Sequence, residues 1–288
     1  MIHKYNITKD FEFKTVMEYL ESYHLGKEKV KRFFLEKVVF LNDMPATAKD
    51  ILKEGDLLCL RLEEEIDYLP DAKKLDIIYE DDYILAVNKP CHILVHPDDK
   101  MKRGTMANIV AFYYQNKGWT YPVRYAHRLD IDTTGVLLFA KDPLSLAKLD
   151  KMIFTHELQR CYLCLAKGIF KNKKATIDSP IGVDRHHQQR KRISKTGKKA
   201  ITHYEVVKEY KGYSLVKVYL ETGRTHQIRV HLASIGHPLL GDVLYGLQDE
   251  RFPRVMLHSY EAVFQHPVTR ERIIVRKELP FDMKKWIK

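Results

Sequence analysis

A polar turn with two carboxylates, Asp130 and Asp132, directly precedes the apolar stretch at residues 136–140. A carboxylate at the mouth of a strand suits a nucleophile or a base, above all with the cation Arg128 two residues before it and the conformationally free Gly135 after it. Aspartate is also a common turn residue. The turn alone therefore favours an ordinary structural cap, and other segments must decide.

The same segment, DIDTTG, fits the DxDxT pattern of the aspartyl phosphatases, in which the first aspartate is phosphorylated beside a magnesium ion. Those phosphatases resemble one another in placing the pattern after a hydrophobic parallel strand. Here the preceding residues 124–129 are polar and basic, and the apolar stretch follows. The downstream lysine and acidic pair that would hold phosphate and metal are not evident. We therefore disfavour a phosphatase.

Histidines and cysteines offer no convincing metal site. His226 and His231 are five residues apart, which places them on different faces of a helix and on opposite faces of a strand, and no HExxH motif occurs. Cys161 and Cys164 form a CxxC, but they lie in the apolar run CYLCLA without a second cysteine pair. We expect buried strand cysteines, and neither a metal nor a disulfide framework.

The composition indicates a polyanionic partner. Lysine and arginine number 49 against 38 acidic residues, which gives a formal charge of +11 and a pI of about 9.2. Such an excess attracts phosphate backbones through counterion release, so nucleic acid is the expected partner. The apolar runs are strand-length, too short to span a bilayer, and the start lacks a secretory signal. We expect no membrane association and a cytoplasmic protein.

Turn residues and periodicity divide the chain into two parts, with a small α+β unit at residues 1–70 and a larger α+β domain at residues 71–288. The small unit is expected to hold a helix at 27–36 and strands at 38–41 and 57–62. Its charged end, with Pro70, is the best linker candidate at residues 63–74, so we expect a flexible tether. The larger domain is expected to hold strands at 76–79, 83–88, 136–140, 161–166, 202–207 and 214–220, and helices at 105–116, 143–156 and 225–236.

The most basic stretch, residues 185–199, holds seven lysines or arginines and hardly any apolar side chain. Such a composition predicts an exposed loop. A plain solvated surface and an RNA-backbone contact both fit it, and the overall charge favours the RNA contact.

Four ordered segments resemble the RluA/RluD class of RNA pseudouridine synthases. HRLDIDTTGVLLFAK at 127–141 is similar to that family's HRLDxxTSGLLLFAK, and AVNKPCHILVHP at 86–97 is similar to VNKPxGxxVHP. RCYLCLAKG at 160–168 is similar to KxYxAxxxG, and residues 221–242 match TGRTHQIRxHLxxxGxPxxGD almost throughout. Together they cover roughly residues 75–280. The departures are Thr134 for serine, His92 for glycine and Arg160 for lysine.

The resemblance implies an enzyme that turns uridine into pseudouridine without a cofactor, with Asp130 as the catalytic carboxylate. It implies that Arg224 pairs with Asp130 and that Tyr162 stacks on the target uracil and is suited to removing its carbon-five proton. Arg128 would fill the space that the displaced base leaves. Further residues expected at the RNA are His127, Lys89, Thr134, His226, Gln227 and Arg229.

The resemblance also implies the fold and the substrate. We expect a mixed, mainly antiparallel central sheet with flanking helices. The amino-terminal unit more faintly resembles the RNA-binding module of ribosomal protein S-four, with Lys37 and Asp43 in place of two expected glycines. Ribosomal RNA of the large subunit is the expected substrate, transfer RNA the second, and the chain is expected to be a monomer. The alternative is an RNA-binding assembly factor that keeps the fold without catalysis.

Overall fold

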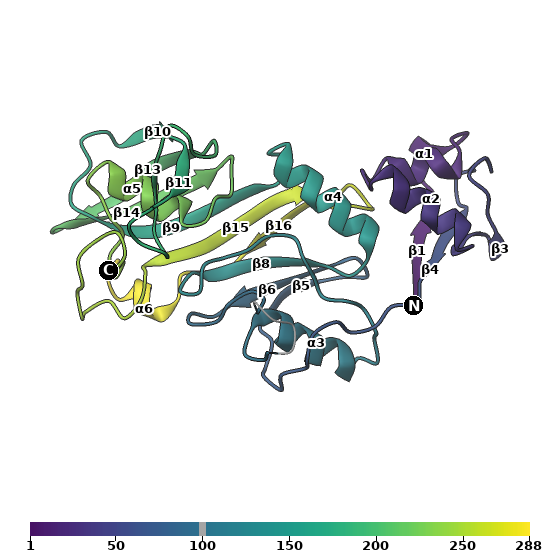
Figure 1. Cartoon of the computed structure of the whole chain (residues 1–288), viewed down its shortest axis with the longest axis horizontal. Helices are drawn as coiled ribbons and strands as arrows, with labels where there is room; N and C mark the ends of the chain where they lie inside the picture. Colours follow the sequence, from purple (N-terminus) through teal and green to yellow (C-terminus); the bar gives the residue numbers. More distant parts are fainter. Residues whose placement is uncertain (98–101) are drawn as a thin grey trace.

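Among the described residues the chain forms three sheets of very different size, and the four-stranded one lies at one end of the molecule (Figure 1). The structure, a computed structural model, describes residues 1–97 and 102–288. A four-stranded sheet is formed within residues 2–61, and a ten-stranded sheet begins at residue 77. The expected α+β class, with a mixed and mainly antiparallel sheet, is confirmed.

The amino-terminal unit packs two α-helices on a sheet with strand order β1-β4-β2-β3. The sequence predicts α2, β2 and β4 to within one residue at each end, but it misses β1 and α1. Strand β1 is short and its partner β4 lies far along the chain, so its local pattern is weak. The elements are β1 (Ile2–Asn6), η1 (Lys9–Phe11), α1 (Val16–Glu21), α2 (Lys27–Leu35), β2 (Val39–Leu41), β3 (Met44–Pro45) and β4 (Leu57–Arg61).

Helix α2 ends in a left-handed turn at Lys37, whose φ is 53°. The amide of Val38 donates to the Phe33 carbonyl, and the amide of Lys37 donates to the Phe34 carbonyl, which is the Schellman pattern. Glycine is the usual residue at that position, because a Cβ disfavours the left-handed region. Asp43 also has a positive φ, 64°. Both residues that replace the expected glycines thus adopt a conformation that glycine would favour.

Replacing Lys37 with glycine should stabilise the protein by about 0.5–1 kcal/mol. The left-handed conformation costs a residue with a side chain roughly 1–2 kcal/mol, and glycine loses part of that gain through chain entropy. Thermal unfolding should show a midpoint higher by about 1–4 °C. The control Lys31→Gly, in the exposed middle of α2, should cost about 1 kcal/mol. Equal midpoints for the two variants would contradict strain at Lys37.

The amino-terminal unit is docked on the larger domain, so the expected flexible tether is wrong. The Tyr5 hydroxyl donates to Oδ1 of Asp142 at 2.6 Å, and Leu144 is fully buried in the core of the small unit. Residues 62–76 form no helix or strand, but Tyr68 is buried in the main core and Glu64 is ion-paired with Arg124. The connecting segment is therefore anchored along its length.

The ten-stranded sheet has the order β10-β13-β14-β9-β15-β8-β6-β5, with β16 beside β15 and β7 beside β8. Its pairs are antiparallel except β8 with β15, which run parallel. The strands are β5 (Ile77–Glu80), β6 (Ile84–Lys89), β7 (Arg124–Tyr125), β8 (Thr134–Ala140), β9 (Gln159–Lys167), β10 (Lys174–Asp178), β13 (Ile201–Tyr210), β14 (Tyr213–Leu220), β15 (Leu257–Gln265) and β16 (Arg272–Arg276).

Central strands are buried on both faces, because helices cover them from either side. Along β6, Leu85 and Val87 belong to the cluster that includes α3 (Met106–Asn116), while Ile84 belongs to the cluster that includes α4 (Pro143–Phe154). This alternation follows the two-residue period of a strand. It explains why β6 and β8 read as continuous apolar runs.

The remaining elements frame the other half of the sheet. Helix α5 (Gln227–Ser234) lies beside a two-stranded hairpin, β11 (Ile181–Val183) with β12 (Lys191–Ile193), and α6 (Phe281–Lys284) is near the carboxyl end (Figure 1). The basic stretch at 185–199 is thus not wholly a loop, since β12 lies inside it. No helix among the described residues is long and apolar enough to cross a membrane.

Strand β9 carries both cysteines of the CxxC. Cys161 and Cys164 are buried, free and three residues apart, which places them on opposite faces of the strand. Burial raises the pKa of the Cys161 thiol to about 11 and that of Cys164 further. The prediction of buried strand cysteines is confirmed.

Candidate active site

A cavity of about 600 Å³ opens between the turn before β8, the end of α4, strand β9 and the segment that leads into α5. Its lining residues fall within 126–133, 150–162 and 220–229, together with Lys199 and Leu257. Three of the four sequence segments singled out above therefore meet in one place.

A backbone hydrogen bond and a close approach of two strands fix the position of the turn that carries Asp130. The amide of Thr133 donates to the Asp130 carbonyl at 3.0 Å, and the chain then enters β8. Gly135 has a φ of 107°, and a Cβ there would lie 2.1 Å from the Ser259 carbonyl oxygen of β15. Glycine is therefore required for β8 to approach β15, and that approach sets where the turn lies.

Two buried cations hold the backbone of this turn. Nζ of Lys89 donates to the carbonyls of Ile131 at 2.9 Å and Pro90 at 2.8 Å, and Nη1 of Arg254 donates to the Asp132 carbonyl at 3.1 Å. Burial lowers the pKa of the Lys89 ammonium to about 8. The backbone carbonyls of the turn accept hydrogen bonds from these two cations, and the Asp130 side chain lines the cavity.

Arg229 of α5 joins Asp130 to a second carboxylate. Its Nη1 lies 3.4 Å from Oδ2 of Asp130, and its Nε and Nη2 each donate to Asp242 at 2.8 Å. Asp242 is fully buried. Burial opposes the charge on Arg229, but the hydrogen bonds and charge of Asp242 outweigh it and raise the pKa of the guanidinium. A bidentate pair thus fixes a permanent cation at Asp130.

The predicted pairing of Arg224 with Asp130 is wrong. Arg224 is exposed in the turn before α5, and its Nε donates to the Lys199 carbonyl at 2.9 Å. Arg229 lies in the helix itself and faces the cavity. Both arginines belong to the same motif, TGRTHQIR, and both line the cavity, so the motif alone does not distinguish the one that contacts Asp130.

His226 approaches Asp130 from a strained backbone position. It caps α5 with φ 59° and ψ 18°, in the left-handed region, and its Nε2 lies 4.0 Å from Oδ2 of Asp130. Such conformations gather at functional sites, where surrounding contacts maintain them. Burial lowers the pKa of the imidazole, which favours its neutral form.

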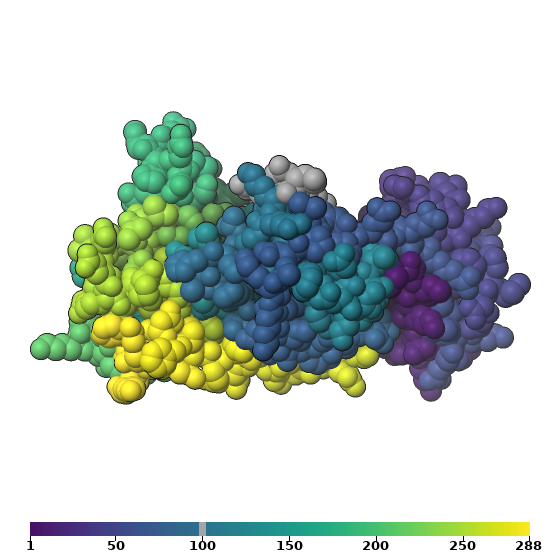
Figure 2. Space-filling view, turned by 90° about the horizontal axis from the view of Figure 1, so that it is seen from below, coloured from purple at the N-terminus to yellow at the C-terminus, as the bar shows by residue number. Residues whose placement is uncertain are grey.

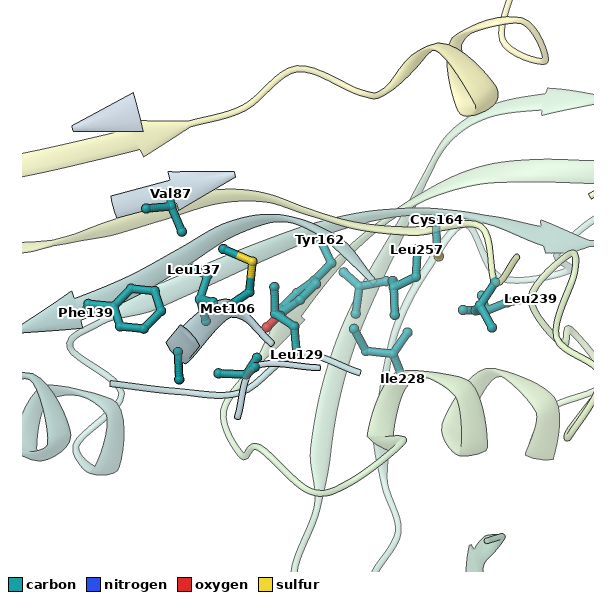
Figure 3. Packing of buried hydrophobic residues seen from close by; sticks show 14 of the residues in the cluster. Val87, Met106, Leu129, Leu137, Phe139, Tyr162, Cys164, Ile228, Leu239 and Leu257 are labelled. Atoms are coloured by element: carbon teal, nitrogen blue, oxygen red, sulfur yellow. The ribbon is translucent and has the colours of Figure 1, made fainter. Parts of the chain in front are cut away.

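Tyr162 lines the same cavity as Asp130 and packs among apolar side chains. It is 4% exposed and belongs to the same buried cluster as Leu129, Ile228 and Leu257, all four of which line the cavity. Figure 3 shows Tyr162 next to Leu129, with Leu257 and Ile228 close by. Burial raises the pKa of the Tyr162 phenol. A flat apolar floor next to a carboxylate suits a planar base with its sugar at Asp130.

Comparison with known proteins decides what kind of site this is. Residues 83–234, more than half of the chain, match the family described as RNA pseudouridylate synthase. The chain belongs to this family. It is an RNA pseudouridine synthase, and the matched residues include Asp130 and all of the cavity lining except Leu257.

Relatives of the synthase cover most of its length. An uncharacterised RNA pseudouridine synthase of Bacillus subtilis, YhcT, is 45% identical over 81% of this chain and 79% of its own. The ribosomal large subunit pseudouridine synthase D of Pseudomonas aeruginosa is 35% identical over 81% of this chain and 78% of its own. The solved structure of human RNA pseudouridylate synthase domain containing 1 has a TM-score of 0.60 at 27% identity, and covers 73% of this chain and 86% of its own.

Four of the residues expected to contact RNA are buried in the synthase. Lys89 is 0% exposed, and Gln227 accepts from Thr222 and donates to Ile201 and Thr202. The other two are His127, whose pKa burial lowers to about 3, and Thr134, which is hydrogen-bonded to His258 at 2.8 Å. Lys89 and Thr134 lie outside the cavity lining, whereas His127 and Gln227 belong to it, and the expected RNA contact of all four stays a prediction.

Replacing Lys89 with methionine should lower stability and leave RNA affinity unchanged. The variant leaves the carbonyls of Pro90 and Ile131 without their donor, which should cost about 1–3 kcal/mol of unfolding free energy. Chemical denaturation gives the stability, and fluorescence anisotropy with a labelled RNA gives the affinity. The exposed Arg128→Met variant should do the reverse, because Arg128 lines the cavity. Weaker RNA binding by folded Lys89→Met would support the predicted contact.

Arg128 is the predicted RNA residue that stays open to solvent at the cavity. Its Nη1 lies 3.3 Å from Nε2 of His96, whose ring stacks on Tyr125 at 4.9 Å between centroids. This arrangement places a guanidinium over the cavity beside stacked rings. It fits the expectation that Arg128 enters the space left by a displaced base, which stays a prediction.

Sequence reasoning missed three residues that shape the synthase site. They are Asp242, which fixes Arg229, Arg254, which holds the Asp130 turn, and Tyr245, which contacts His226. Asp242 had a signal, because it ends the matched motif as Gly241-Asp242. Gly241 has a φ of 73°, and a Cβ there would lie 1.9 Å from the Arg254 carbonyl oxygen. Arg254 and Tyr245 stand outside the motifs quoted above.

The phosphatase arrangement is absent from the described residues around Asp130. Strand β8 begins at Thr134, after the DIDT segment, and β7, the two-residue strand before the segment, runs antiparallel to β8. The DIDT segment therefore does not follow a parallel strand, as the phosphatase pattern would require.

Proposed function

We propose that this synthase isomerises specific uridines of large-subunit ribosomal RNA, with Asp130 as the catalytic carboxylate and without a cofactor. The contact of Asp130 with Arg229 carries the proposal. The pair sets an acidic side chain beside a fixed cation in a cavity of about 600 Å³ that Tyr162 and His226 also line. Arg229 supplies a fixed positive charge in contact with the carboxylate, whose ionised form is the one that can attack or take a proton.

The reaction is an isomerisation, so its atoms and electrons balance without a donor. The bond from the ribose to uracil nitrogen breaks, the base turns, a bond from the ribose to carbon five forms, and the proton on carbon five moves to nitrogen. Asp130 can attack the anomeric carbon, add to the uracil ring or remove the ribose two-prime proton. All three routes need an ionised carboxylate.

Tyr162 fits the uracil by stacking better than by proton transfer. Because burial raises the pKa of its phenol, the side chain stays protonated at neutral pH and is a poor base. Its ring and the apolar side chains beside it offer a face to a flat base. The proton on carbon five then leaves to another acceptor near the site.

The target uridine has to leave its stack before it can reach Asp130. Extrusion of a base costs a few kcal/mol, which binding must offset. Arg128 is proposed to fill the vacated space, since a guanidinium both stacks and donates hydrogen bonds. The basic stretch at 185–199 would contact the RNA backbone, and the amino-terminal unit, if S-four-like, would add a second contact.

The names of relatives support the choice of RNA. Two of them, from Nitrosomonas europaea and Pseudomonas aeruginosa, are ribosomal large subunit pseudouridine synthase D, at 32% and 35% identity. We propose the same class of substrate for this chain, acted on by a monomer in the cytoplasm.

A pseudouridine map tests the proposal. Ribosomal and transfer RNA are sequenced from cells that lack this gene and from the same cells rescued with wild-type or Asp130→Asn protein. We expect defined large-subunit positions to lose pseudouridine and to regain it only with wild type. Loss at transfer RNA positions would correct the substrate. An unchanged map, or rescue by Asp130→Asn, would favour the non-catalytic assembly factor.

A further inference from the structure

The basic stretch at 185–199 forms an arm whose carboxyl end reaches the cavity. Figure 2 shows this green part of the chain projecting from the surface. Its lysines and arginines are exposed or half-buried, and strand β12 within it pairs with β11. Lys199 at its end lines the same cavity as Asp130. We call residues 181–199 the basic arm.

One side chain, Tyr245, connects the basic arm to α5. Its hydroxyl oxygen accepts the backbone amide of Lys191 in β12 at 2.8 Å. Its ring packs with Ile181 of β11 and Val230 of α5 in a small buried cluster. The guanidinium of Arg190 also lies over this ring, 5.6 Å from its centroid. Tyr245 thus contacts both strands of the arm.

The other side of Tyr245 faces the catalytic groups. Its hydroxyl lies 2.9 Å from Nδ1 of His226, and the two rings meet edge-on. The Arg229 guanidinium lies 5.1 Å from the centroid of the Tyr245 ring. Among the residues that the structure describes, His226 and Arg229 are the two that make an ion-pair contact with Asp130 within 4.0 Å. One tyrosine therefore touches both partners of the carboxylate.

The hydrogen bonds are compatible with one chain of proton donation, from the Lys191 amide to Tyr245 and from Tyr245 to His226. A backbone amide can only donate, so the Tyr245 oxygen accepts from Lys191 and its own proton is free for Nδ1 of His226. A neutral His226 then carries its proton on Nε2, the nitrogen that faces Asp130. Burial favours the neutral imidazole and the protonated phenol, because it lowers the pKa of His226 and raises that of Tyr245.

We propose that Tyr245 is a positioning residue that links the basic arm to the catalytic pocket. RNA seated on the arm holds β12 against Tyr245, and Tyr245 holds His226 with its Nε2 proton toward Asp130. The inference rests on the proposed role of Asp130. It assigns to the arm a second task besides RNA binding, which is to align the site when substrate is present.

Tyr245→Phe tests the link, because it removes the hydroxyl and keeps the ring and its packing. Total RNA from cells that lack the gene serves as substrate, and pseudouridine formation is followed in single turnovers with the enzyme in saturating excess. Partners that orient a functional histidine are typically worth about 10–100-fold in activity. We expect a loss of that size in the saturated rate, with RNA affinity within about twofold of wild type and a thermal midpoint lower by about 1–6 °C, because the Lys191 amide loses its acceptor.

A control variant and a double variant test whether Tyr245 acts through His226. Tyr79→Phe, the same change in β5 and outside the cavity lining, should leave both the saturated rate and the RNA affinity unchanged. In a His226→Gln background Tyr245→Phe should have little further effect, since it acts through that ring. An unchanged saturated rate, a loss confined to affinity or additive losses would each overturn the proposal. Asp130→Asn in the same assay reports separately on the proposed function.

Discussion

Replacing Asp130 with asparagine should lower the single-turnover rate of pseudouridine formation by at least about 1000-fold, at the upper end of what loss of one reacting group costs. The amide has nearly the same shape as the carboxylate but cannot attack the ribose or take its proton. Arg229 keeps its two bonds to Asp242 in the variant, so the fold and the cavity should persist. RNA affinity should be equal to or above that of wild type, because the cavity loses a negative charge.

Asp132→Asn is the matched control for this experiment. It removes the second carboxylate of the same turn, whose Oδ1 contacts Nδ1 of His92 at 3.0 Å, well away from Arg229. We expect a rate within about threefold of wild type, since Asp132 is half-buried and lies outside the cavity lining. Equal losses in both variants would place the effect on the turn as a whole. Activity in Asp130→Asn would end the proposed role of Asp130.

Much of the fold follows from local patterns. The helix at 143–154 has Pro143 in its first turn and Asp142 as its cap, with apolar residues at helical spacing, and it is found where the sequence predicts it. Strands β6 and β8 are continuous apolar runs because both faces of the sheet are covered. Such signals lie within a dozen residues, so no tertiary information is needed to find them.

The docking of the amino-terminal unit could not be predicted in this way. The charged residues 63–74 have the composition of a linker, yet Tyr5 and Leu144 bring the two parts together from positions about 140 residues apart. The burial of Lys89 is a second feature that the local sequence does not predict. Lysine is usually exposed, and only the carbonyls of Pro90 and Ile131 in the folded turn make its burial favourable.

The candidate site was likewise predicted only in part. Asp130 and Tyr162 stand at positions that motifs identify, and both line the cavity. The partner of Asp130 depends on the left-handed turn at His226, which directs the chain into α5 so that Arg229, not Arg224, faces the carboxylate. A motif that holds two arginines cannot reveal which one the backbone turns inward.

The two arginines of this motif give the second large prediction. Arg229→Gln leaves the fully buried Asp242 without its cation, and breaking a buried pair on one side typically costs about 3–5 kcal/mol. The variant also removes the cation at Asp130, so the rate should fall even at a temperature where the protein is folded. Arg224→Gln changes an exposed side chain and should cost less than about 0.5 kcal/mol with little loss of rate.

A double variant separates the two consequences of losing Arg229. Arg229→Gln with Asp242→Asn removes both buried charges, and the asparagine oxygen can still accept the amides that Asp242 caps at Leu244 and Tyr245. Chemical denaturation should show part of the lost stability restored, because no unpaired charge stays buried. The single-turnover rate should stay low, because Asp130 still lacks its cation. Recovery of the rate together with stability would mean that Arg229 serves the fold alone, and a large loss of rate in Arg224→Gln would return the catalytic pairing to that arginine.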